Sequence, residues 1–503
     1  MTKIFNNAKI KPKKSKEVSI MTDSTVRLSS VSIQNFKNIK SGQLNFLNPR
    51  KNYKASILGL YGQNGSGKTT LVDALQLLKY ILCGKPIPQH IADYINVEAD
   101  YAALLYTFDI STSSIKYKVF YECRLRKEEN IEEQNIEIYN IHEKQSKSVI
   151  FDEVLSYSFE EKEKEKSEEK NRKLRKSPFI DTRTEKVFIP VSKYECLVGK
   201  NKEREMNLFV AKKIASHTSR SFIFSGELIN AIRSQRVQQE NNAEYIRHLT
   251  LLENLIYYGN YELFVIRTAN NGMISMNTLP LAFKYQEQNS EAVGQMMLPL
   301  DTSAVIPKES VEIVKKVIYD MNIVLNQIVP GLTISLKNLG VQILENGKTG
   351  NKIQLMSQKN SREIPLKYES EGIKKIISIL QLFIVIYNQS SITVVIDELD
   401  TGIFEYLLGE ILRVISEKGK GQLIFTSHNL RPLETLDRGF IAFTTTNPLK
   451  RYIRLSSVKE NNNLRDFYFR DIVLGEQQEE IYKLTNNAEI AMAFREAGEI
   501  SAP

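Results

Sequence analysis

The eight residues from Gly62 to Thr69 combine glycines, a lysine and a threonine in a spacing that can bind phosphate. They follow the apolar run SILGLY and precede TTLVDALQLLKYIL, which has helical periodicity, so the loop should join a strand to a helix. Such a P-loop turns its backbone N–H groups toward phosphates, its lysine reaches the β- and γ-phosphates, and its threonine hydroxyl is a Mg²⁺ ligand. We therefore predict ATP and Mg²⁺ as ligands. The expected nucleotide contacts are Gly62, Gln63, Asn64, Gly65, Ser66, Gly67, Lys68, Thr69 and Thr70.

Two carboxylates, Asp397 and Glu398, follow the apolar run from Thr393 to Ile396. A buried strand of this kind would bring both acids to the sheet edge beside the P-loop. There we expect Asp397 to hold Mg²⁺ together with Thr69, and Glu398 to orient and deprotonate the attacking water. An apolar run that ends in two acids is common by itself, so this prediction depends on the P-loop.

His428 follows another short apolar run, Leu423 to Thr426, and should emerge at the same sheet edge. This position favours a sensor of the γ-phosphate, so the predicted catalytic residues are Glu398 and His428. Single histidines are more often structural. No similar placement is found for the other four, His90, His142, His217 and His248.

Ser370 and Gly372 open a predicted helix that precedes the Asp397 strand. Serine is a favoured N-cap, and a helix start that offers a hydroxyl and free N–H groups can bind an anion. The P-loop of the same chain already has a helix start of its own. We therefore expect Ser370 and Gly372 to complete the nucleotide site of a second copy.

These residues require a parallel sheet with crossover helices to position them. The chain alternates between helical and strand patterns after Tyr368, which is typical of such a sheet. Helices are expected at 372–387 and 403–415, and strands at 392–396, 422–425 and 440–444. Elsewhere we expect helices at 310–329 and 477–496, a strand at VRLSSVSIQNF, and a solvated helix or loop in the charged run 160–176.

The composition is that of a globular protein with real cores, since 42% of the 503 residues are apolar and 25% are charged. No run is apolar enough to cross a membrane, which predicts a cytoplasmic protein without a membrane partner. The three cysteines, Cys83, Cys123 and Cys196, have the spacing of neither a disulfide framework nor a metal site. The net charge of +9 permits nucleic-acid binding without demonstrating it.

The ordered set GQNGSGKTT, SEGIKK, VVIDELD and IFTSHN resembles the ATP-binding cassette (ABC) ATPases of the SMC/RecF group. The segment Phe36-Lys37-Asn38-Ile39 is similar to the one that opens those heads. Within the group, SEGIKKIISILQLF and IDELDTGIFEYL are most similar to the short OLD-like ATPases of bacterial anti-phage and abortive-infection systems, such as PARIS and Septu. The resemblance covers residues 28–82 and 366–446.

The resemblance implies that two heads dimerise around ATP, with Ser370 and Gly372 of one head capping the γ-phosphate held at Lys68 of the other. It also implies a catalytic Glu398 and a switch histidine at His428. In one departure, Glu371 stands where the usual signature has glycine, and slow hydrolysis is expected unless its carboxylate turns away from the phosphate. In another, the sequence does not locate the glutamine that contacts Mg²⁺ in the Q-loop.

The expected fold is α/β, a P-loop NTPase head of the ABC type with a mixed sheet and flanking helices, interrupted by a long α+β insertion. The insertion should be β-rich in its first half and helical in its second. The expected parts are a flexible tail at 1–26, the N-terminal half of the head at 27–82, the insertion at 83–365, the C-terminal half of the head at 366–455, and an extension at 456–503.

The expected function is an ATPase that dimerises on ATP and regulates a separate effector, such as a nuclease, in anti-phage defence. OLD nucleases carry a TOPRIM domain after the ATPase, and none is expected here, because the residues after His428 include no second acid-tipped strand. The alternative is a RecF/SMC-like repair or recombination ATPase that clamps DNA. A transporter ATPase is disfavoured by the long segment between the P-loop and Ser370, and a kinase or GTPase leaves Ser370 and Gly372 unexplained.

Overall fold

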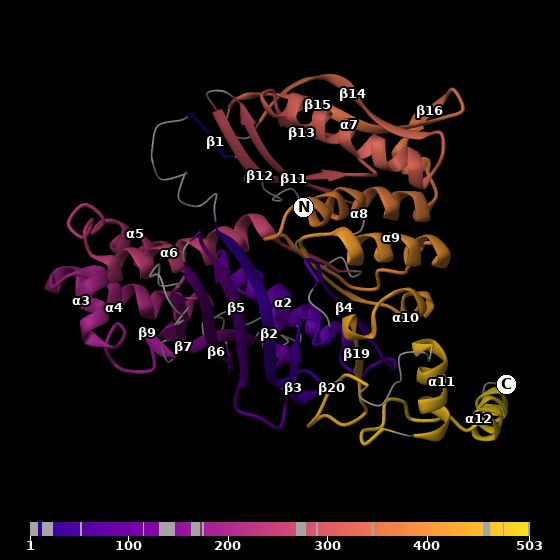
Figure 1. Cartoon of the computed structure of the whole chain (residues 1–503), viewed down its shortest axis with the longest axis horizontal. Coiled ribbons are helices and arrows are strands. Elements are labelled where there is room, and N and C mark those ends of the chain that lie inside the picture. Colours follow the sequence, from indigo (N-terminus) through magenta and orange to yellow (C-terminus); the bar gives the residue numbers. More distant parts are fainter. Residues whose placement is uncertain are drawn as a thin grey trace, which may run out of the picture.

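The computed structural model describes twelve stretches of the chain (Figure 1). They are residues 9–12, 24–50, 53–113, 115–129, 146–161, 172–173, 176–267, 278–287, 290–344, 347–455, 463–475 and 477–500. Most of the expected tail at 1–26 and most of the charged run at 160–176 lie outside these ranges. Within the tail, residues 9–12 form strand β1 (Lys9–Pro12), which pairs with β12 (Ser290–Pro299).

A six-stranded sheet, called the head sheet below, lies at the centre of the molecule. Its order is β10 (Leu263–Ile266), β17 (Thr393–Ile396), β18 (Gln422–Thr426), β4 (Ser56–Tyr61), β19 (Ile441–Thr444) and β20 (Tyr452–Ile453). Neighbours are parallel from β10 to β19, and β20 is antiparallel to β19. The prediction of a mixed α/β sheet with flanking helices is confirmed.

Both faces of the head sheet are buried, which explains why its strands are continuous apolar runs. In β4, Leu58 and Leu60 belong to one hydrophobic core, together with residues of α2 (Lys68–Leu82). Ile57 and Tyr61, which point the other way, belong to a second core with residues of α8 (Glu371–Asn388) and α9 (Glu405–Lys418). The head sheet therefore separates two cores, and the loop between β4 and α2 lies at its carboxyl edge.

A second, antiparallel sheet covers α2 and belongs to the first core. Its strands are β2 (Thr25–Phe36), β3 (Ile39–Asn45), β5 (Ala102–Ser111), β6 (Ile115–Glu129), β7 (Ser146–Glu161), β8 (Arg172–Lys173) and β9 (Ser177–Asp181). Because β2 pairs with β5, the segment expected as an insertion continues a sheet that begins in the head. The short η1 (Gln89–Tyr94) precedes β5, and helices α3 (Val191–Val198), α4 (Lys202–His217), α5 (Gly226–Arg233) and α6 (Ala243–Tyr257) follow this sheet.

The second half of residues 83–365 was expected to be helical, but its described residues also contain seven strands. After η2 (Tyr258–Glu262), β10 joins the head sheet. The others form two smaller sheets over the second core, near α7 (Ser310–Ile328), which is the helix expected at 310–329 (Figure 1). β11 contains Pro280 and β12 contains Gly294, residue types that strands disfavour, which weakened the local strand signal. The remaining strands are β11 (Thr278–Glu287), β13 (Ala304–Pro307), β14 (Leu332–Ile343), β15 (Thr349–Lys359) and β16 (Arg362–Pro365), followed by η3 (Leu366–Tyr368).

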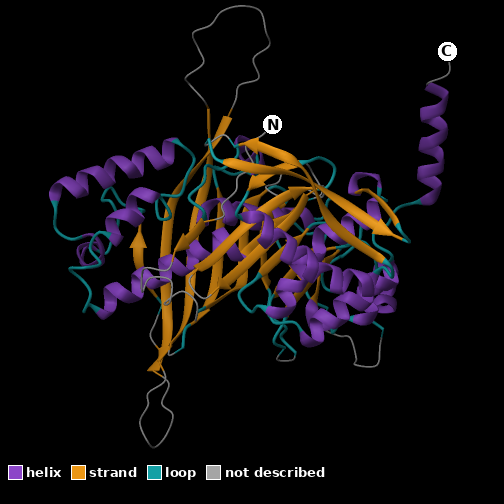
Figure 2. Cartoon of the chain, turned by 90° about the horizontal axis from the view of Figure 1, so that it is seen from above, coloured by secondary structure: helices purple, strands orange, loops and turns teal. Residues whose placement is uncertain are grey.

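The C-terminal part contains α10 (Arg431–Thr435), η4 (Arg438–Phe440), α11 (Leu464–Leu474) and α12 (Asn487–Ile500). The helix expected at 477–496 begins only at residue 487, and α11 was not predicted. Figure 2 shows α12 standing away from the body. In the part of the chain that the structure describes, no helix is both long and apolar enough to span a bilayer.

Candidate nucleotide site

The P-loop joins β4 to α2 and takes a conformation that needs its glycines. Gly62, Gly65 and Gly67 have φ angles of 147°, 75° and 99°, in the region that glycine adopts most readily. A Cβ on Gly62 would also overlap the hydroxyl of Thr444. No side chain caps the first turn of α2. Its backbone N–H groups are therefore oriented to receive an anion.

Lys68 is 7% exposed, and its ammonium donates to the carbonyl oxygens of Gly62 (2.8 Å) and Gln63 (3.1 Å). Burial lowers the pKa of Lys68, and the charges of Asp397, Glu398 and Asp400 oppose this effect. The fold thus places the predicted phosphate-binding lysine within electrostatic range of the predicted acids. Those acids come from a strand more than 300 residues later in the chain.

The turn between β2 and β3 and the strand β20 hold the P-loop backbone. The Asn38 side-chain amide donates to the Gly65 carbonyl, and the Tyr452 hydroxyl donates to that of Gly67 at 3.0 Å. The hydroxyl of Thr70, an expected nucleotide contact, donates to Asn38 Oδ1 at 3.1 Å. Asn38 belongs to the segment noted for its resemblance to ABC heads. In the structure, this segment therefore holds the P-loop backbone in place.

The C-terminal extension also contacts the P-loop. Gln63 Nε2 donates to the Lys483 carbonyl at 3.4 Å, and the Lys483 N–H donates to Gln63 Oε1 at 3.1 Å. Asn64 and Gly65, the next two residues, are exposed. The outer part of the loop is therefore open to solvent, while Gln63 is held by a segment that no sequence motif marked.

Asp397 and Glu398 lie at the carboxyl end of β17, as expected. The Thr426 hydroxyl, at the end of β18, donates to Asp397 Oδ1 (2.7 Å) and accepts from the Glu398 N–H (2.8 Å). Asp397 is only 5% exposed. Glu398 has a φ of 48°, which directs its side chain differently from the strand pattern. The two carboxylates therefore have different orientations and different degrees of exposure.

Asp400 is a third acid at this edge and was not predicted. Its Oδ2 accepts from the backbone N–H groups of His428 (3.2 Å) and Asn429 (3.0 Å), which join the turn after β17 to the turn after β18. Its Oδ1 is buried without a hydrogen-bond partner among the described residues. His428 itself is exposed. The sequence signal was present, because Asp400 is the last acid of the run Asp-Glu-Leu-Asp.

The start of α8 lies beside the same acids. Ser370 is exposed and its hydroxyl accepts from the Ile373 N–H at 3.3 Å, as an N-cap does. A Cβ on Gly372 would lie 2.6 Å from the Gly402 carbonyl oxygen, so only glycine fits this approach. The carboxylate of Glu371 is 82% exposed and pairs with Lys374 at 2.6 Å. The negative charge of Glu371, the residue that departs from the usual signature, is thus paired with the positive charge of Lys374 on the same helix.

Lys375, one turn further along α8, was also missed. It is 4% exposed, and its ammonium donates to the Glu398 carbonyl oxygen at 3.4 Å. Burial lowers the pKa of Lys375 to about 8, against the opposing charges of Asp400, Glu398 and Asp397. A lysine in the middle of an apolar helical pattern has no local signature of such a role, because only the fold brings it to the acids.

A buried ionic group lies behind the P-loop. Asp73 on α2 pairs with Lys37, which follows β2, and with Arg267 at 3.0 Å. Arg267 follows the last residue of β10, beside the strand that carries Asp397. Burial raises the pKa of Asp73, while Lys37 and Arg267 act in the opposite direction. The sequence did not locate the glutamine that contacts Mg²⁺ in the Q-loop. In the structure, the residue that follows β10, the strand beside β17, is Arg267.

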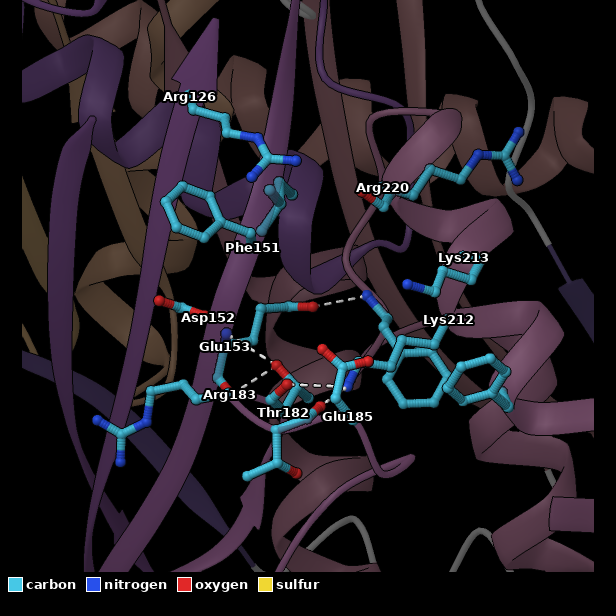
Figure 3. A pocket seen from close by; sticks show the side chains of 15 residues that line it. Arg126, Phe151, Asp152, Glu153, Thr182, Arg183, Glu185, Lys212, Lys213 and Arg220 are labelled. Carbon is cyan, nitrogen blue, oxygen red and sulfur yellow. Dashed lines mark hydrogen bonds between the residues drawn. The ribbon is translucent and has the colours of Figure 1, made fainter. Parts of the chain in front are cut away.

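A separate cavity of about 290 Å³ lies between α4 and the sheet formed by β6, β7 and β9 (Figure 3). The buried carboxylate among its lining residues is Glu153, which accepts from the Tyr121 hydroxyl (2.7 Å) and the Phe222 N–H (2.8 Å). The Lys212 ammonium donates to the carbonyl oxygens of Thr182 and Thr184. Both charged groups are therefore occupied by contacts that hold this region together, and the P-loop edge remains the candidate site.

The residues at the P-loop edge fit ATP and Mg²⁺. The Thr69 hydroxyl and the Asp397 carboxylate are oxygen donors of the kind that Mg²⁺ prefers. The open N-terminus of α2 and the buried Lys68 ammonium suit a polyphosphate. Among the described residues there is no group of three or more histidines, cysteines, aspartates or glutamates that could hold a metal by itself. All three cysteines are free thiols.

A family model described as AAA ATPase domain matches residues 27–431. A search of curated proteins found no match. The chain is similar to solved structures of SMC heads, which include an Smc head bound to the C-winged helix domain of ScpA (12% identity, TM-score 0.35), one with an extended coiled coil bound to the C-terminal domain of ScpA derived from Pyrococcus furiosus (11%, 0.34), and the SMC head domain from Thermotoga maritima (12%, 0.34). Each similarity covers 86% of this chain and 98%, 96% and 99% of the other chain, respectively.

Proposed function

We propose that two copies of this chain, which belongs to the AAA ATPase domain family and is an ATPase, close head to head around two ATP molecules. In each copy Lys68 and the first turn of α2 bind the phosphates, and Thr69 and Asp397 hold Mg²⁺. Bound there, Mg²⁺ supplies positive charge against the phosphates. Glu398 orients and deprotonates the attacking water, and His428 senses the γ-phosphate.

The observation that carries this proposal is the placement of the start of α8. Ser370 and Glu371 are exposed, while the contact between Gly372 and Gly402 and the bond from Lys375 to Glu398 hold the rest of the turn against the acid-bearing loop. The P-loop already has its own helix start in α2. An exposed second helix start at the same functional edge is suited to a phosphate brought by another copy.

We further propose that this ATP-dependent dimer regulates a separate effector protein, such as a nuclease, in bacterial anti-phage defence. The support is the resemblance of SEGIKKIISILQLF and IDELDTGIFEYL to the OLD-like ATPases of such systems. Under this proposal the chain contributes the nucleotide switch, and the effector contributes the toxic reaction. Assembly with the effector depends on whether ATP is bound.

The second candidate is an ATPase that clamps DNA, and the observation that favours it is the net charge of +9. DNA binding of this kind weakens steeply as salt rises, because phosphate contacts release counterions. ATP-dependent binding of duplex DNA, with an affinity that falls steeply between about 50 and 200 mM salt, would favour the clamp. Salt-insensitive recruitment of a protein would favour the regulator.

ATP hydrolysis and molecular mass, measured for the wild type, Lys68→Ala and Glu398→Gln with and without ATP, test the dimer proposal. We expect Glu398→Gln to form a larger, ATP-locked assembly that hydrolyses poorly, and Lys68→Ala neither to hydrolyse nor to assemble. If Glu398→Gln hydrolyses like the wild type, Glu398 is not the base. If the mass does not respond to ATP, the composite site is wrong.

A further inference from the structure

The turn that begins α8 and the turn that follows β17 are in contact at two points within one chain. At one point the backbone of Gly372 approaches the Gly402 carbonyl so closely that an added Cβ would lie 2.6 Å from its oxygen. At the other the Lys375 ammonium donates to the Glu398 carbonyl at 3.4 Å. Two contacts, three residues apart on the helix, fix both its position and its rotation relative to the loop.

The segment that these contacts hold has an unusual backbone. Glu398 has a φ of 48°, a left-handed conformation that costs free energy for a residue other than glycine. Such a conformation persists where the surroundings impose it. On one side the Thr426 hydroxyl accepts from the Glu398 N–H, and on the other side Lys375 donates to its carbonyl. The peptide groups on both sides of the Glu398 Cα are thus held by named partners.

Burying the ammonium of Lys375 at this point costs free energy. This residue is 4% exposed, and burial of an ammonium carries a desolvation cost that needs compensation. The compensation comes from the Asp397, Glu398 and Asp400 charges, which favour its charged form. Its neighbour Lys374 points elsewhere and pairs with Glu371 and Asp301. Lys374 is buried as well, and of these two lysines Lys375 is the one that contacts Glu398.

We propose that Lys375 is a positioning residue that couples the start of α8 to Glu398 of the same chain. This rests on the proposed function, in which the start of α8 binds the γ-phosphate of the second copy's ATP. Phosphate bound at that helix start fixes the positions of Gly372 and Lys375. Their contacts with the loop then hold the backbone of Glu398, which orients its carboxylate in the chain's own nucleotide site. Each copy then hydrolyses its ATP efficiently only when the other copy also holds ATP.

The test compares Lys375→Met, which keeps the length of the side chain without its charge, with Lys375→Arg and with the control Lys418→Met, an exposed lysine on α9. Steady-state hydrolysis over a range of ATP concentrations gives kcat, KM and the Hill coefficient. Binding of a fluorescent ATP analogue and thermal unfolding are measured in parallel. We expect the wild type to have a Hill coefficient above 1.

For Lys375→Met we expect kcat to fall roughly tenfold or more and the Hill coefficient to fall to about 1, while analogue binding changes by less than about threefold, because the contacts of Lys68 are intact. Lys375→Arg should restore cooperativity in part, and Lys418→Met should match the wild type. A Lys375→Met protein with wild-type kcat and Hill coefficient overturns the proposal. So does a variant that loses kcat but keeps its cooperativity.

A second variant covers the case in which Lys375→Met does not fold. Gly372→Ala disturbs the backbone contact with Gly402, at the helix start that the proposed function assigns to the second copy's γ-phosphate, and keeps Lys375. It should also lower the Hill coefficient, and a folded Gly372→Ala protein with unchanged cooperativity overturns the coupling. If the wild type hydrolyses ATP without dependence on Lys68, the proposed function itself fails. If hydrolysis depends on Lys68 but the Lys375 and Gly372 variants have the kcat and the Hill coefficient of the wild type, the proposed function stands and this inference fails.

Discussion

At the scale of residues, the site depends on groups that the backbone holds in special conformations. The P-loop glycines adopt positive φ angles that L-residues rarely reach, and Glu398 adopts one without being a glycine. The single hydroxyl of Thr426 donates to the Asp397 carboxylate and accepts from the Glu398 N–H. The chemistry is therefore concentrated at strand ends whose geometry is set by hydrogen bonds rather than by local preference.

Buried titratable residues away from the site affect stability, and His248 is a clear case. It is fully buried, stacks on Phe179 with ring centroids 4.6 Å apart, and contacts the Tyr157 hydroxyl at 3.1 Å. Burial lowers the pKa of His248 to about 3, with Lys193 and Arg247 acting in the same direction. The unfolded chain then binds more protons than the folded one between pH 6.5 and 3, so stability is full above pH 6.5 and is lost as the pH falls.

We expect His248→Phe, which keeps a stacked ring but cannot titrate, to lose less stability on acidification than the wild type. The difference should be about 1.4 kcal/mol per pH unit below pH 6.5. Urea unfolding at pH 7.5, 6 and 5 measures it. The control is His217→Gln, an exposed histidine at the end of α4. Equal slopes for the wild type and His248→Phe would contradict the prediction.

At the scale of elements, the site is the meeting point of strand ends and helix starts. β4, β17 and β18 are parallel neighbours, so their carboxyl ends and the loops that follow share one edge. The starts of α2 and α8 reach the same edge. Behind it, Asp73 joins α2 to β10 and to the loop after β2 through Arg267 and Lys37.

Because this ionic group connects three elements, we expect Asp73→Asn to be strongly destabilising. It leaves Arg267, which is 7% exposed, and Lys37 without their shared carboxylate. Removing one partner of a buried ion pair costs about 3–5 kcal/mol. Urea unfolding of Asp73→Asn beside Asp320→Asn, an exposed aspartate on α7, measures this. A loss below about 1 kcal/mol for Asp73→Asn would show that the pair is not a link between these elements.

At the scale of the whole molecule, the head sheet divides two hydrophobic cores, and the long middle segment contributes to both. Strands β5 to β9 cover the α2 side, while β11 to β16 and α7 cover the side of α8. The described part of α12 contributes to neither core, since its side chains are exposed (Figure 2). The residues from 477 to 486 differ from it, because Lys483 holds Gln63 of the P-loop.

This arrangement predicts that removing residues 487–503 leaves the free energy of unfolding within about 0.5 kcal/mol of the wild type, as for surface changes. Basal ATP hydrolysis should also be retained. A longer deletion that starts at residue 477 should weaken ATP binding, because it removes the contact with Gln63. Urea unfolding and analogue binding of both truncated chains test this. A large loss of stability from the shorter deletion would show that α12 packs on the body.

The local parts of this protein could be predicted from the amino-acid sequence. The P-loop, the acids after an apolar run and the alternation of helices and strands after Tyr368 are local patterns, because glycine spacing and apolar periodicity reflect the conformation of adjacent residues. The non-local parts became known from the three-dimensional fold. It placed β10 beside β17 and continued the sheet of β2 with β5. It also brought Lys375 to Glu398, joined Asp400 to the turn after β18, and paired Arg267 with Asp73. Pairing between distant strands and the approach of a helix to a loop depend on both partners at once, and neither partner carries a local signature of the other.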